Sequence, residues 1–419
     1  MSMTRLLYSL AWAIALPAAL VRLAWRSRKQ PGYRERWRER LGRYETGAPQ
    51  PLIWVHAVSV GETRAAAPIV AELRRRWPGH HVLLTHMTPT GRATGHELFG
   101  DSVTRCWLPY DLRFAVRRFL GQFRPAFGVL LETEVWPRLI EECRAAGIPV
   151  VLANARLSER SARRYARWPT LARWAFGNLA AVAAQSEEDA ARFRGLGARE
   201  VSVTGNVKFD IALPADAIEK GRALRTRWAS GRPVWIAGST RDGEEALLLD
   251  AWAQIRSDAL LVIVPRHPQR FDEVAALAAA RGFMVARRSE ERTVSADVRV
   301  LVGDSMGEMA AYYAGADVVI MGGSLLEYGS QNLIEPCALG RPVILGPHTY
   351  NFAEAAKGAL AVGAAVSVVD APQALAQAEA IGRDVARREA MGAAGLAFVA
   401  AHRGAVPRLA AVIAAASRA

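Results

Sequence analysis

From Pro51 onward, short apolar runs alternate with longer stretches in which apolar residues recur with helical period, and this alternation restricts the possible folds more than any other feature. Uninterrupted apolar runs are typical of strands buried on both faces, as in a parallel sheet covered by helices. The first seven runs are Leu52–Val58, His81–Thr85, Val103–Leu108, Phe127–Leu131, Val150–Ala153, Ala181–Ala184 and Val201–Thr204. We therefore expect an α/β domain built on a doubly wound parallel sheet.

A second series of runs follows a short polar stretch, Ile211–Asp216, which contains Pro214 and which we interpret as a linker. The later runs are Val234–Ala237, Leu260–Val264, Met284–Ala286, Val300–Val302, Val318–Met321, Val343–Leu345 and Ala365–Val369. Because 51% of the residues are hydrophobic, the chain can bury two large cores. We expect two Rossmann-like domains that face each other across a cleft, one over residues 31–212 and one, with C-terminal helices, over residues 213–419.

Residues 1–30 form a third part, which we interpret as a membrane anchor. The segment Leu6–Leu20 is apolar except for Tyr8 and Ser9, and nine basic but only two acidic residues follow within residues 22–43. A basic cluster after an apolar segment favours an anionic membrane surface over nucleic acid, and we expect it to keep the following domains in the cytoplasm. The segment either spans the bilayer or lies in its interface. A helix buried in the protein is the third possibility.

Several common kinds of segment and site have no support in the sequence. A signal peptide would carry its basic residues before the apolar run rather than after it. The three cysteines are widely spaced, so we expect neither a disulfide framework nor a cysteine zinc site, and a reducing compartment. Neither a dinucleotide-binding glycine motif nor a P-loop follows any predicted strand, and no H-E-x-x-H motif suggests a metal.

Charged side chains follow three predicted strands of the first domain. Glu62 comes after the first strand, where a helix begins, and a helix N-terminus stabilises a carboxylate that could act as a general base. Glu132 follows the fourth strand, and Lys208 follows the seventh, close to the linker. A compact ammonium group at that point could neutralise a phosphate or a carboxylate. Each residue also has an ordinary alternative role, as a helix cap or an exposed loop residue.

The second domain places glycine-rich and basic turns after its strands. The turns are Gly238–Arg241, Pro265–Pro268, Gly303–Glu308, Gly322–Ser324 and Gln331–Pro336. Backbone amides in such turns and at helix N-termini bind anions. Glu335, in the first turn of a predicted helix, could bind ribose hydroxyls. Together the five turns favour a nucleotide site, although loops of α/β domains contain glycines for other reasons as well.

Six motifs occur in order along the chain: WVHAVSVGE (54–62), ETEVWP (132–137), GNVKFD (205–210), PRHPQRF (265–271), GDSMGE (303–308) and GGS…QNLIEP (322–336). Together with the N-terminal anchor they resemble the bacterial Kdo transferases of lipopolysaccharide synthesis, over nearly the whole chain. The resemblance implies the GT-B glycosyltransferase fold. It also implies an inverting transfer of 3-deoxy-D-manno-octulosonic acid (Kdo) from CMP-Kdo to a lipid A precursor, lipid IVA, at the cytoplasmic face of the inner membrane.

The resemblance also implies a role for each matching residue. Glu62 would be the general base that deprotonates the acceptor hydroxyl, and Glu132 and Lys208 would help to stabilise the transition state. CMP would contact Pro265, Arg266, Met306, Gly307, Glu308, Asn332, Leu333, Ile334 and Glu335. The resemblance implies neither a metal ion nor a cofactor. The chain departs from the family pattern at Ser330 and Leu333, where we expect a glycine and a proline.

Two other functions remain open at this point. Another GT-B nucleotide-sugar transferase or epimerase would share the fold, although a soluble epimerase would have no use for a basic, apolar N-terminus. A basic protein that only binds lipid or nucleic acid would need no general base at Glu62. Activity with CMP-Kdo, compared with activity with UDP-sugars, separates the Kdo transferase from another GT-B enzyme. A Glu62→Ala variant separates both enzymes from a protein that only binds lipid or nucleic acid.

Overall fold

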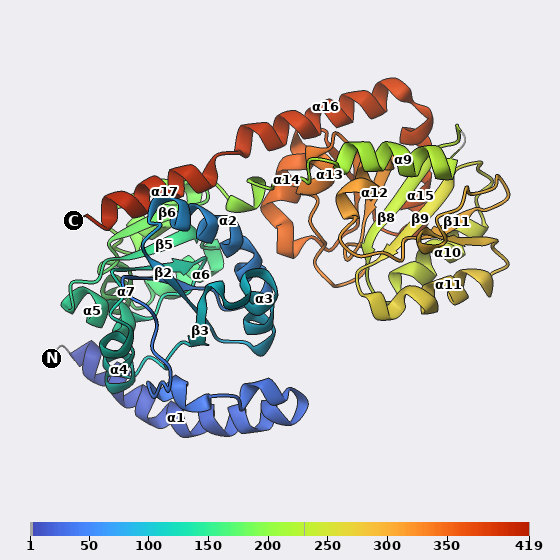
Figure 1. Cartoon of the computed structure of the whole chain (residues 1–419). Coiled ribbons are helices and arrows are strands. Elements are labelled where there is room, and N and C mark those ends of the chain that lie inside the picture. The colour runs from blue at the N-terminus through green and yellow to red at the C-terminus, as the bar shows by residue number, and fades with distance from the viewer. Residues whose placement is uncertain (1–2, 230, 419) are drawn as a thin grey trace. The chain divides into compact units, whose positions relative to one another are not determined.

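The computed structural model describes residues 3–229 and 231–418, and these divide into two compact units. The first unit runs from the N-terminus to Asp210 and also contains the segment from Arg403 onward, whereas the second runs from Ile211 to His402 (Figure 1). Each unit contains one seven-stranded sheet. Residues 1, 2, 230 and 419, which the expected domain ranges include, lie outside the described residues.

The first sheet has the strand order β3-β2-β1-β4-β5-β6-β7, and its paired strands are parallel. Its strands are β1 (Leu52–His56), β2 (His81–His86), β3 (Thr104–Trp107), β4 (Phe127–Leu131), β5 (Val150–Ala155), β6 (Ala181–Ala184) and β7 (Val201–Val203). Its helices are α2 (Val60–Arg76), α3 (Pro89–Phe99), α4 (Arg113–Phe123), α5 (Pro137–Ala145), α6 (Glu159–Ala166), α7 (Pro169–Phe176) and α8 (Glu187–Gly195). Along β1, Leu52 and Trp54 enter one core while Ile53 and Val55 enter another, which is why this run has no polar alternation.

The second sheet has the order β10-β11-β9-β8-β12-β13-β14 and is also parallel. Its strands are β8 (Val234–Thr240), β9 (Leu260–Pro265), β10 (Val285–Arg287), β11 (Val300–Val302), β12 (Val318–Met321), β13 (Val343–Leu345) and β14 (Ala365–Ser367). Its helices are α9 (Ala217–Ala229), α10 (Glu244–Ala253), α11 (Phe271–Ala279), α12 (Met309–Gly315), α13 (Ile334–Ala338), α14 (Ala353–Ala361), α15 (Ala371–Arg383) and α16 (Val385–His402). All fourteen expected strands are present, so the expected fold class is confirmed for both units.

The last helix corrects one expectation about the domains. We expected residues 213–419 to form the second domain, but α17 (Ala405–Ala416) belongs to the first unit. Val406, Leu409 and Ile413 enter the core that also holds Ile53 of β1, and the Asp210 carboxylate accepts the amides of Gly404 at 2.6 Å and Val406 at 2.5 Å. The sequence gives this helix an apolar face but does not say which sheet the face covers.

The N-terminal segment is one helix, α1 (Met3–Lys29), which packs on the first unit along one side. The Tyr8 hydroxyl donates to Asp111 at 2.6 Å, and the Arg138 guanidinium donates to the Ser9 hydroxyl at 3.0 Å. The opposite side is exposed and apolar, with Leu6, Leu10, Ile14, Val21 and Trp25 all more than half accessible to solvent. In the described chain two helical stretches are long and apolar enough to cross a membrane. In α1 none of the residues in the most apolar 18-residue stretch is buried, whereas the other helical stretch, Val385–Ala416, is partly buried.

Candidate active site

At the carboxyl edge of the first sheet, α2 begins directly after β1 and presents Glu62 in its first turn. Ser59 is the N-cap of α2, and its hydroxyl both accepts from the Glu62 amide at 3.4 Å and donates to the Glu62 carboxylate at 2.9 Å. The second carboxylate oxygen accepts the Val58 amide at 2.9 Å. Glu62 is therefore held in one orientation by the turn between β1 and α2, as in a capping box.

The surroundings of Glu62 raise its pKa to about 7. Burial is the main cause, because it penalises the charged carboxylate, while the hydrogen bonds from Val58 and Ser59 oppose the rise. The neighbouring carboxylates of Glu132 and Glu134 raise the pKa further by repulsion. A carboxyl group with a pKa near 7 suits a general base, because such a base is both available and strong near neutral pH.

Glu132 follows β4, the neighbour of β1, and its backbone adopts a left-handed conformation with φ of 58°. Its side chain is buried and lies between two cations, with Arg156 Nε at 3.3 Å from one carboxylate oxygen and Lys208 Nζ at 3.9 Å from the other. Burial lowers the pKa of Lys208, while the charges of Glu132 and Glu62 raise it. The structure thus brings together the three residues that the sequence analysis proposed as catalytic.

Two residues at this edge were missed in the sequence analysis, Asn154 and Arg156, which lie at and directly after the end of β5. Asn154 is fully buried, with φ of 50°, and its Oδ1 accepts the Val207 amide at 3.1 Å. This bond fixes the short helix η4 (Val207–Phe209) that carries Lys208. Within the described residues, no partner is found for Asn154 Nδ2. The only signal that the sequence contains for Asn154 and Arg156 is their position at and directly after the end of β5, which neighbours β4.

At the carboxyl edge of the second sheet, β9 ends at Pro265 and is followed by Arg266, whose amide donates to Thr240 of β8 at 2.9 Å. Tyr313 of α12 is buried, which raises the pKa of its hydroxyl, and two nearby charges also act on this pKa. The charge of Glu335 in α13 raises this pKa, and the charge of Arg266 lowers it. Gly238 is required beside this tyrosine, since a Cβ there would lie 2.6 Å from its ring. The charges of Arg266 and Glu335 are therefore both close enough to the Tyr313 hydroxyl to act on it.

The turn after β11 places Met306 and Gly307 at the surface. Met306 is 60% exposed, and Gly307 has φ of 80°, which favours glycine. Glu308 is held by the Ser305 hydroxyl at 2.5 Å and by Arg288 at 3.1 Å. The backbone of this turn is accessible to a ligand, whereas the Glu308 carboxylate already has two partners.

The segment Asn332–Glu335 contains two polar side chains, which bind each other, and two apolar side chains, which are buried. The Asn332 amide group donates to Glu335 at 3.0 Å and its oxygen accepts the Ile334 amide at 3.1 Å, so these two polar side chains form one unit at the start of α13. Leu333 and Ile334 are fully buried. Since their side chains pack in the core, any contact between these two residues and a nucleotide has to use the backbone.

One glycine-rich turn does not match the phosphate-binding hypothesis. We expected Gly322–Ser324 to contribute amides to an anion site, but the buried carboxylate of Glu244 accepts the Gly323 amide at 2.6 Å and the Leu325 amide at 2.9 Å. Glu244 also accepts the Arg241 amide at 2.9 Å. The chain's own carboxylate therefore occupies these donors, and they are not available to a phosphate.

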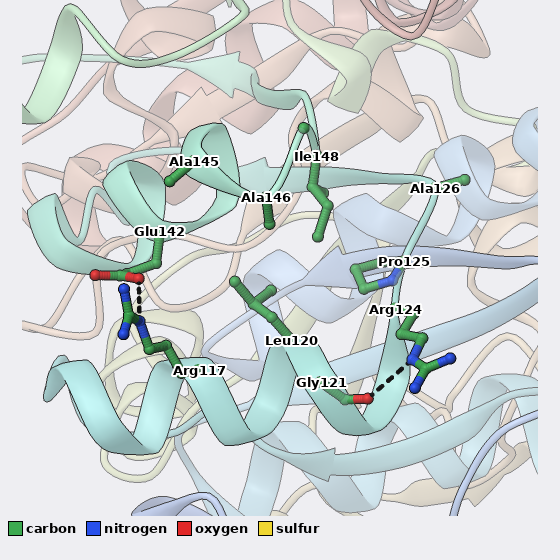
Figure 2. A pocket seen from close by; sticks show the side chains of 11 residues that line it. Arg117, Leu120, Gly121, Arg124, Pro125, Ala126, Glu142, Ala145, Ala146 and Ile148 are labelled. Carbon is green, nitrogen blue, oxygen red and sulfur yellow. Dashed lines mark hydrogen bonds and ion pairs between the residues drawn. The ribbon is translucent and has the colours of Figure 1, made fainter.

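A pocket in the first unit lies away from all of these residues. It has a volume of about 580 Å³ and is lined by the turns that precede β4 and β5, with Leu120, Pro125 and Ile148 among its side chains (Figure 2). Those turns lie at the amino edge of the sheet, whereas Glu62 and Glu132 lie at the carboxyl edge. In open α/β sheets ligands bind beyond the carboxyl ends of strands, so we do not assign the substrate to this pocket. Among the described residues, no group of three or more histidine, cysteine, aspartate or glutamate side chains could hold a metal ion.

Comparisons with known proteins connect these sites to a family. Residues 35–211 match the family described as 3-deoxy-D-manno-octulosonic-acid transferase (kdotransferase). The chain is 47% identical over 386 residues to a 3-deoxy-D-manno-octulosonic acid transferase of Bordetella pertussis, covering 88% of this chain and 89% of the relative. It is 38% identical to the transferase of the same description from Haemophilus influenzae, covering 97% of each chain. Among solved structures, MurG of Acinetobacter baumannii shares the fold, with a TM-score of 0.57 at 17% identity, over 87% of this chain and 99% of that one.

Proposed function

The chain belongs to the family of 3-deoxy-D-manno-octulosonic acid (Kdo) transferases, glycosyltransferases of the GT-B fold, and from this premise we propose its donor, its acceptor and its catalytic residues. The donor is CMP-Kdo, the acceptor is the lipid A precursor lipid IVA, and the transfer inverts the anomeric configuration. The observation that carries this proposal is the half-buried Glu62, whose pKa is raised to about 7 beside Glu132 and Lys208.

In the proposed reaction Glu62 removes the proton from the acceptor hydroxyl while the acceptor oxygen forms a bond to the anomeric carbon of Kdo. The bond from that carbon to the phosphate of CMP breaks, and its electron pair leaves with CMP. Because the acceptor oxygen displaces CMP directly, no covalent enzyme intermediate is required, and the proton remains on Glu62. The positive charge of Lys208 stabilises the negative charge of the donor sugar, which carries a carboxylate. Glu132, whose carboxylate lies 3.9 Å from the Lys208 ammonium group, orients the lysine.

The CMP group is proposed to bind to the second unit. Arg266 supplies the cation for the phosphate, the accessible backbone of Met306 and Gly307 supplies amides, and Glu335 serves the ribose hydroxyls. Pro265, Glu308 and Asn332 complete the site around these groups, and Leu333 and Ile334 contribute only their backbone. We further propose, from the family resemblance, that neither a metal ion nor another cofactor takes part, so that a chelator leaves the rate unchanged.

We also propose that α1 keeps the enzyme on the cytoplasmic face of the inner membrane, and that it lies in the membrane interface rather than across the bilayer. Tyr8 and Arg5 bind the first unit through Asp111 and Glu141, while the opposite, apolar side of the helix stays exposed. A spanning orientation would break those contacts. Alkaline carbonate should therefore extract the full-length protein from membranes, and retention in the extracted membranes would contradict the interfacial orientation.

The central experiment replaces Glu62 by glutamine, which preserves the capping geometry and removes the base. Purified Glu62→Gln protein, CMP-Kdo and lipid IVA should give at least ~100-fold less product by mass spectrometry, the contribution typical of a general base. Titration calorimetry should still detect CMP binding. Glu72→Gln, in the same helix, is the matched control and should keep the wild-type rate.

Wild-type turnover in Glu62→Gln would refute the catalytic assignment. Turnover of the wild-type protein with a UDP-sugar and not with CMP-Kdo would refute the donor and would favour another nucleotide-sugar enzyme. For the nucleotide site, Arg266→Ala should weaken CMP binding, while Arg292→Ala, which removes an exposed arginine paired with Glu290, should not.

A further inference from the structure

A second pocket of the first unit lies where the start of α1 meets α5 and α7, and four arginines line it. Its volume is about 430 Å³, and its lining includes Arg5, Arg144, Arg173, Trp174 and Arg199. None of the described residues that line it is acidic. Neither the catalytic proposal nor the nucleotide proposal uses these side chains.

The charges of this pocket are mostly uncompensated. Arg5 pairs with Glu141 at 2.9 Å, and Arg144 donates to the Asn178 side chain at 3.0 Å. In the part of the chain that the structure describes, no ion pair joins Arg144, Arg173 or Arg199 to an acid. Arginines that line one pocket without paired carboxylates, as Arg144, Arg173 and Arg199 do, are suited to a phosphate, which accepts paired hydrogen bonds from arginine.

The floor of the pocket is an aromatic side chain held by α1. The Trp174 ring lies under the guanidinium groups of Arg5, at 5.9 Å, and Arg138, at 5.0 Å, and Tyr8 meets it edge-on at 5.2 Å. Trp174 is 93% buried, and within the described residues its Nε1 has no hydrogen-bond partner. A buried indole N–H without a partner is uncommon.

The ligand is identified from α1, the helix that carries Arg5 at the edge of the pocket. Met3, Leu6, Leu7 and Leu10 of α1 expose between 54% and 70% of their surface within two turns of Arg5. A phosphate next to an apolar surface is the arrangement of an anionic phospholipid at the membrane interface. The acceptor is a poorer candidate, because Asn178 precedes β6 and Arg199 precedes β7, which places the pocket toward the amino edge of the sheet and away from Glu62.

We propose that this arginine pocket binds the phosphate headgroup of an anionic membrane phospholipid, whose acyl chains lie along the exposed apolar side of α1. The inference rests on the proposed membrane location of α1. It adds a defined lipid site at the start of that helix, separate from the basic segment of residues 22–43. Bound lipid would hold the first unit on the membrane and leave the carboxyl edge of its sheet free for the acceptor.

The test measures vesicle binding of the full-length protein and of an Arg173→Ala/Arg199→Ala variant. With vesicles of phosphatidylglycerol and phosphatidylcholine, the variant should bind about tenfold more weakly or worse, since each arginine near an anionic surface contributes appreciably. With pure phosphatidylcholine the two proteins should bind alike. The control variant Arg118→Ala/Arg163→Ala removes the same charge elsewhere in the first unit and should lose clearly less binding.

Equal losses in both variants would overturn the proposal, because they would indicate only general electrostatic attraction. Displacement from the vesicles by millimolar inorganic phosphate would also overturn it, by showing a site for free phosphate. A loss confined to phosphatidylcholine vesicles that contain the acceptor would assign the pocket to the acceptor instead.

The same variant separates this inference from the catalytic proposal. In detergent, with CMP-Kdo and lipid IVA, Arg173→Ala/Arg199→Ala should keep the wild-type rate. A wild-type protein without transferase activity would contradict the catalytic proposal, while its vesicle binding would still decide the lipid site.

Discussion

The indole rings of Trp12 and Trp136 lie 6.3 Å apart, centroid to centroid, so α1 contacts the loop that carries the acidic residues of the candidate active site. Trp136 donates its N–H to Glu134 at 3.0 Å, and the charge of Glu134 acts on Glu62. The helix that we propose to lie on the membrane is therefore packed against the loop whose Glu134 acts on Glu62, the proposed base.

This contact predicts that Trp12→Ala lowers activity even in detergent, where no membrane is needed. An aromatic pair stabilises a contact by about 0.5–1.5 kcal/mol. If the loss of this contact is felt in the transition state, kcat/KM should fall roughly 2- to 10-fold. Leu10→Ala, which truncates an exposed residue of the same helix, should leave kcat/KM unchanged in detergent. Equal effects of the two substitutions would show that Trp12 has no specific role.

The raised pKa of Glu62 predicts the pH dependence of catalysis. Because the base has to be deprotonated, kcat/KM should rise with pH through about 7 and level off above it. Glu134→Gln removes a repelling charge and should move the rising limb of the pH–rate profile to lower pH. Ser59→Ala removes a hydrogen bond to the Glu62 carboxylate and should move the rising limb to higher pH. A limb that stays fixed in both variants would assign the ionisation to another group.

The same shift predicts a pH-dependent contribution of Glu62 to stability. Its pKa in the folded protein, about 7, lies above its ordinary value of 4.5, so the folded state binds the proton more tightly. The resulting stabilisation is fully present below pH 4.5 and is lost as the pH rises through 7. Glu62→Gln should therefore flatten the pH profile of the free energy of unfolding over this interval, which denaturant titrations at several pH values would measure.

Glu132 and Lys208 should act as a pair in catalysis. Lys208→Met and Glu132→Gln should each lower kcat, and the double variant should lose less than the product of the two single effects, because the residues are 3.9 Å apart. A double-mutant cycle on kcat measures this coupling. Fully multiplicative effects would show that the two side chains act independently.

Ser330 predicts a stabilising substitution. It is buried with φ of 70°, a conformation that costs a residue with a side chain about 1 kcal/mol relative to glycine. Ser330→Gly should therefore stabilise the second unit by up to about 1 kcal/mol, less the loss of the hydroxyl bond to the Gln331 carbonyl at 3.1 Å. Ser330→Ala loses the same bond without relief of the backbone and should destabilise the protein in chemical denaturation.

Features that depend on neighbouring residues were predictable from the sequence. The buried strands followed from uninterrupted apolar runs, and Glu62 from its place where a strand gives way to a helix. The glycine at the position of Ser330 was expected from the family resemblance rather than from neighbouring residues, and it agrees with the left-handed backbone that the structure shows there.

Features that depend on distant contacts were not predictable. Nothing local indicates that Glu244 fills the turn at Gly323, since 79 residues separate them. Likewise Asn154 reaches Val207 only because β5 and β7 flank β6 in the same sheet. The cationic partners of Glu132 come from two other loops.

The return of α17 to the first unit means that the polypeptide crosses between the units twice, after Asp210 and before Arg403. Expression of residues 1–210 alone would omit Leu409 and Ile413 and leave Ile53 and Val55 without part of their cover. A premature stop after His402 would have the same effect, so a lesion at the far end of the gene would damage the fold of the half that is translated first.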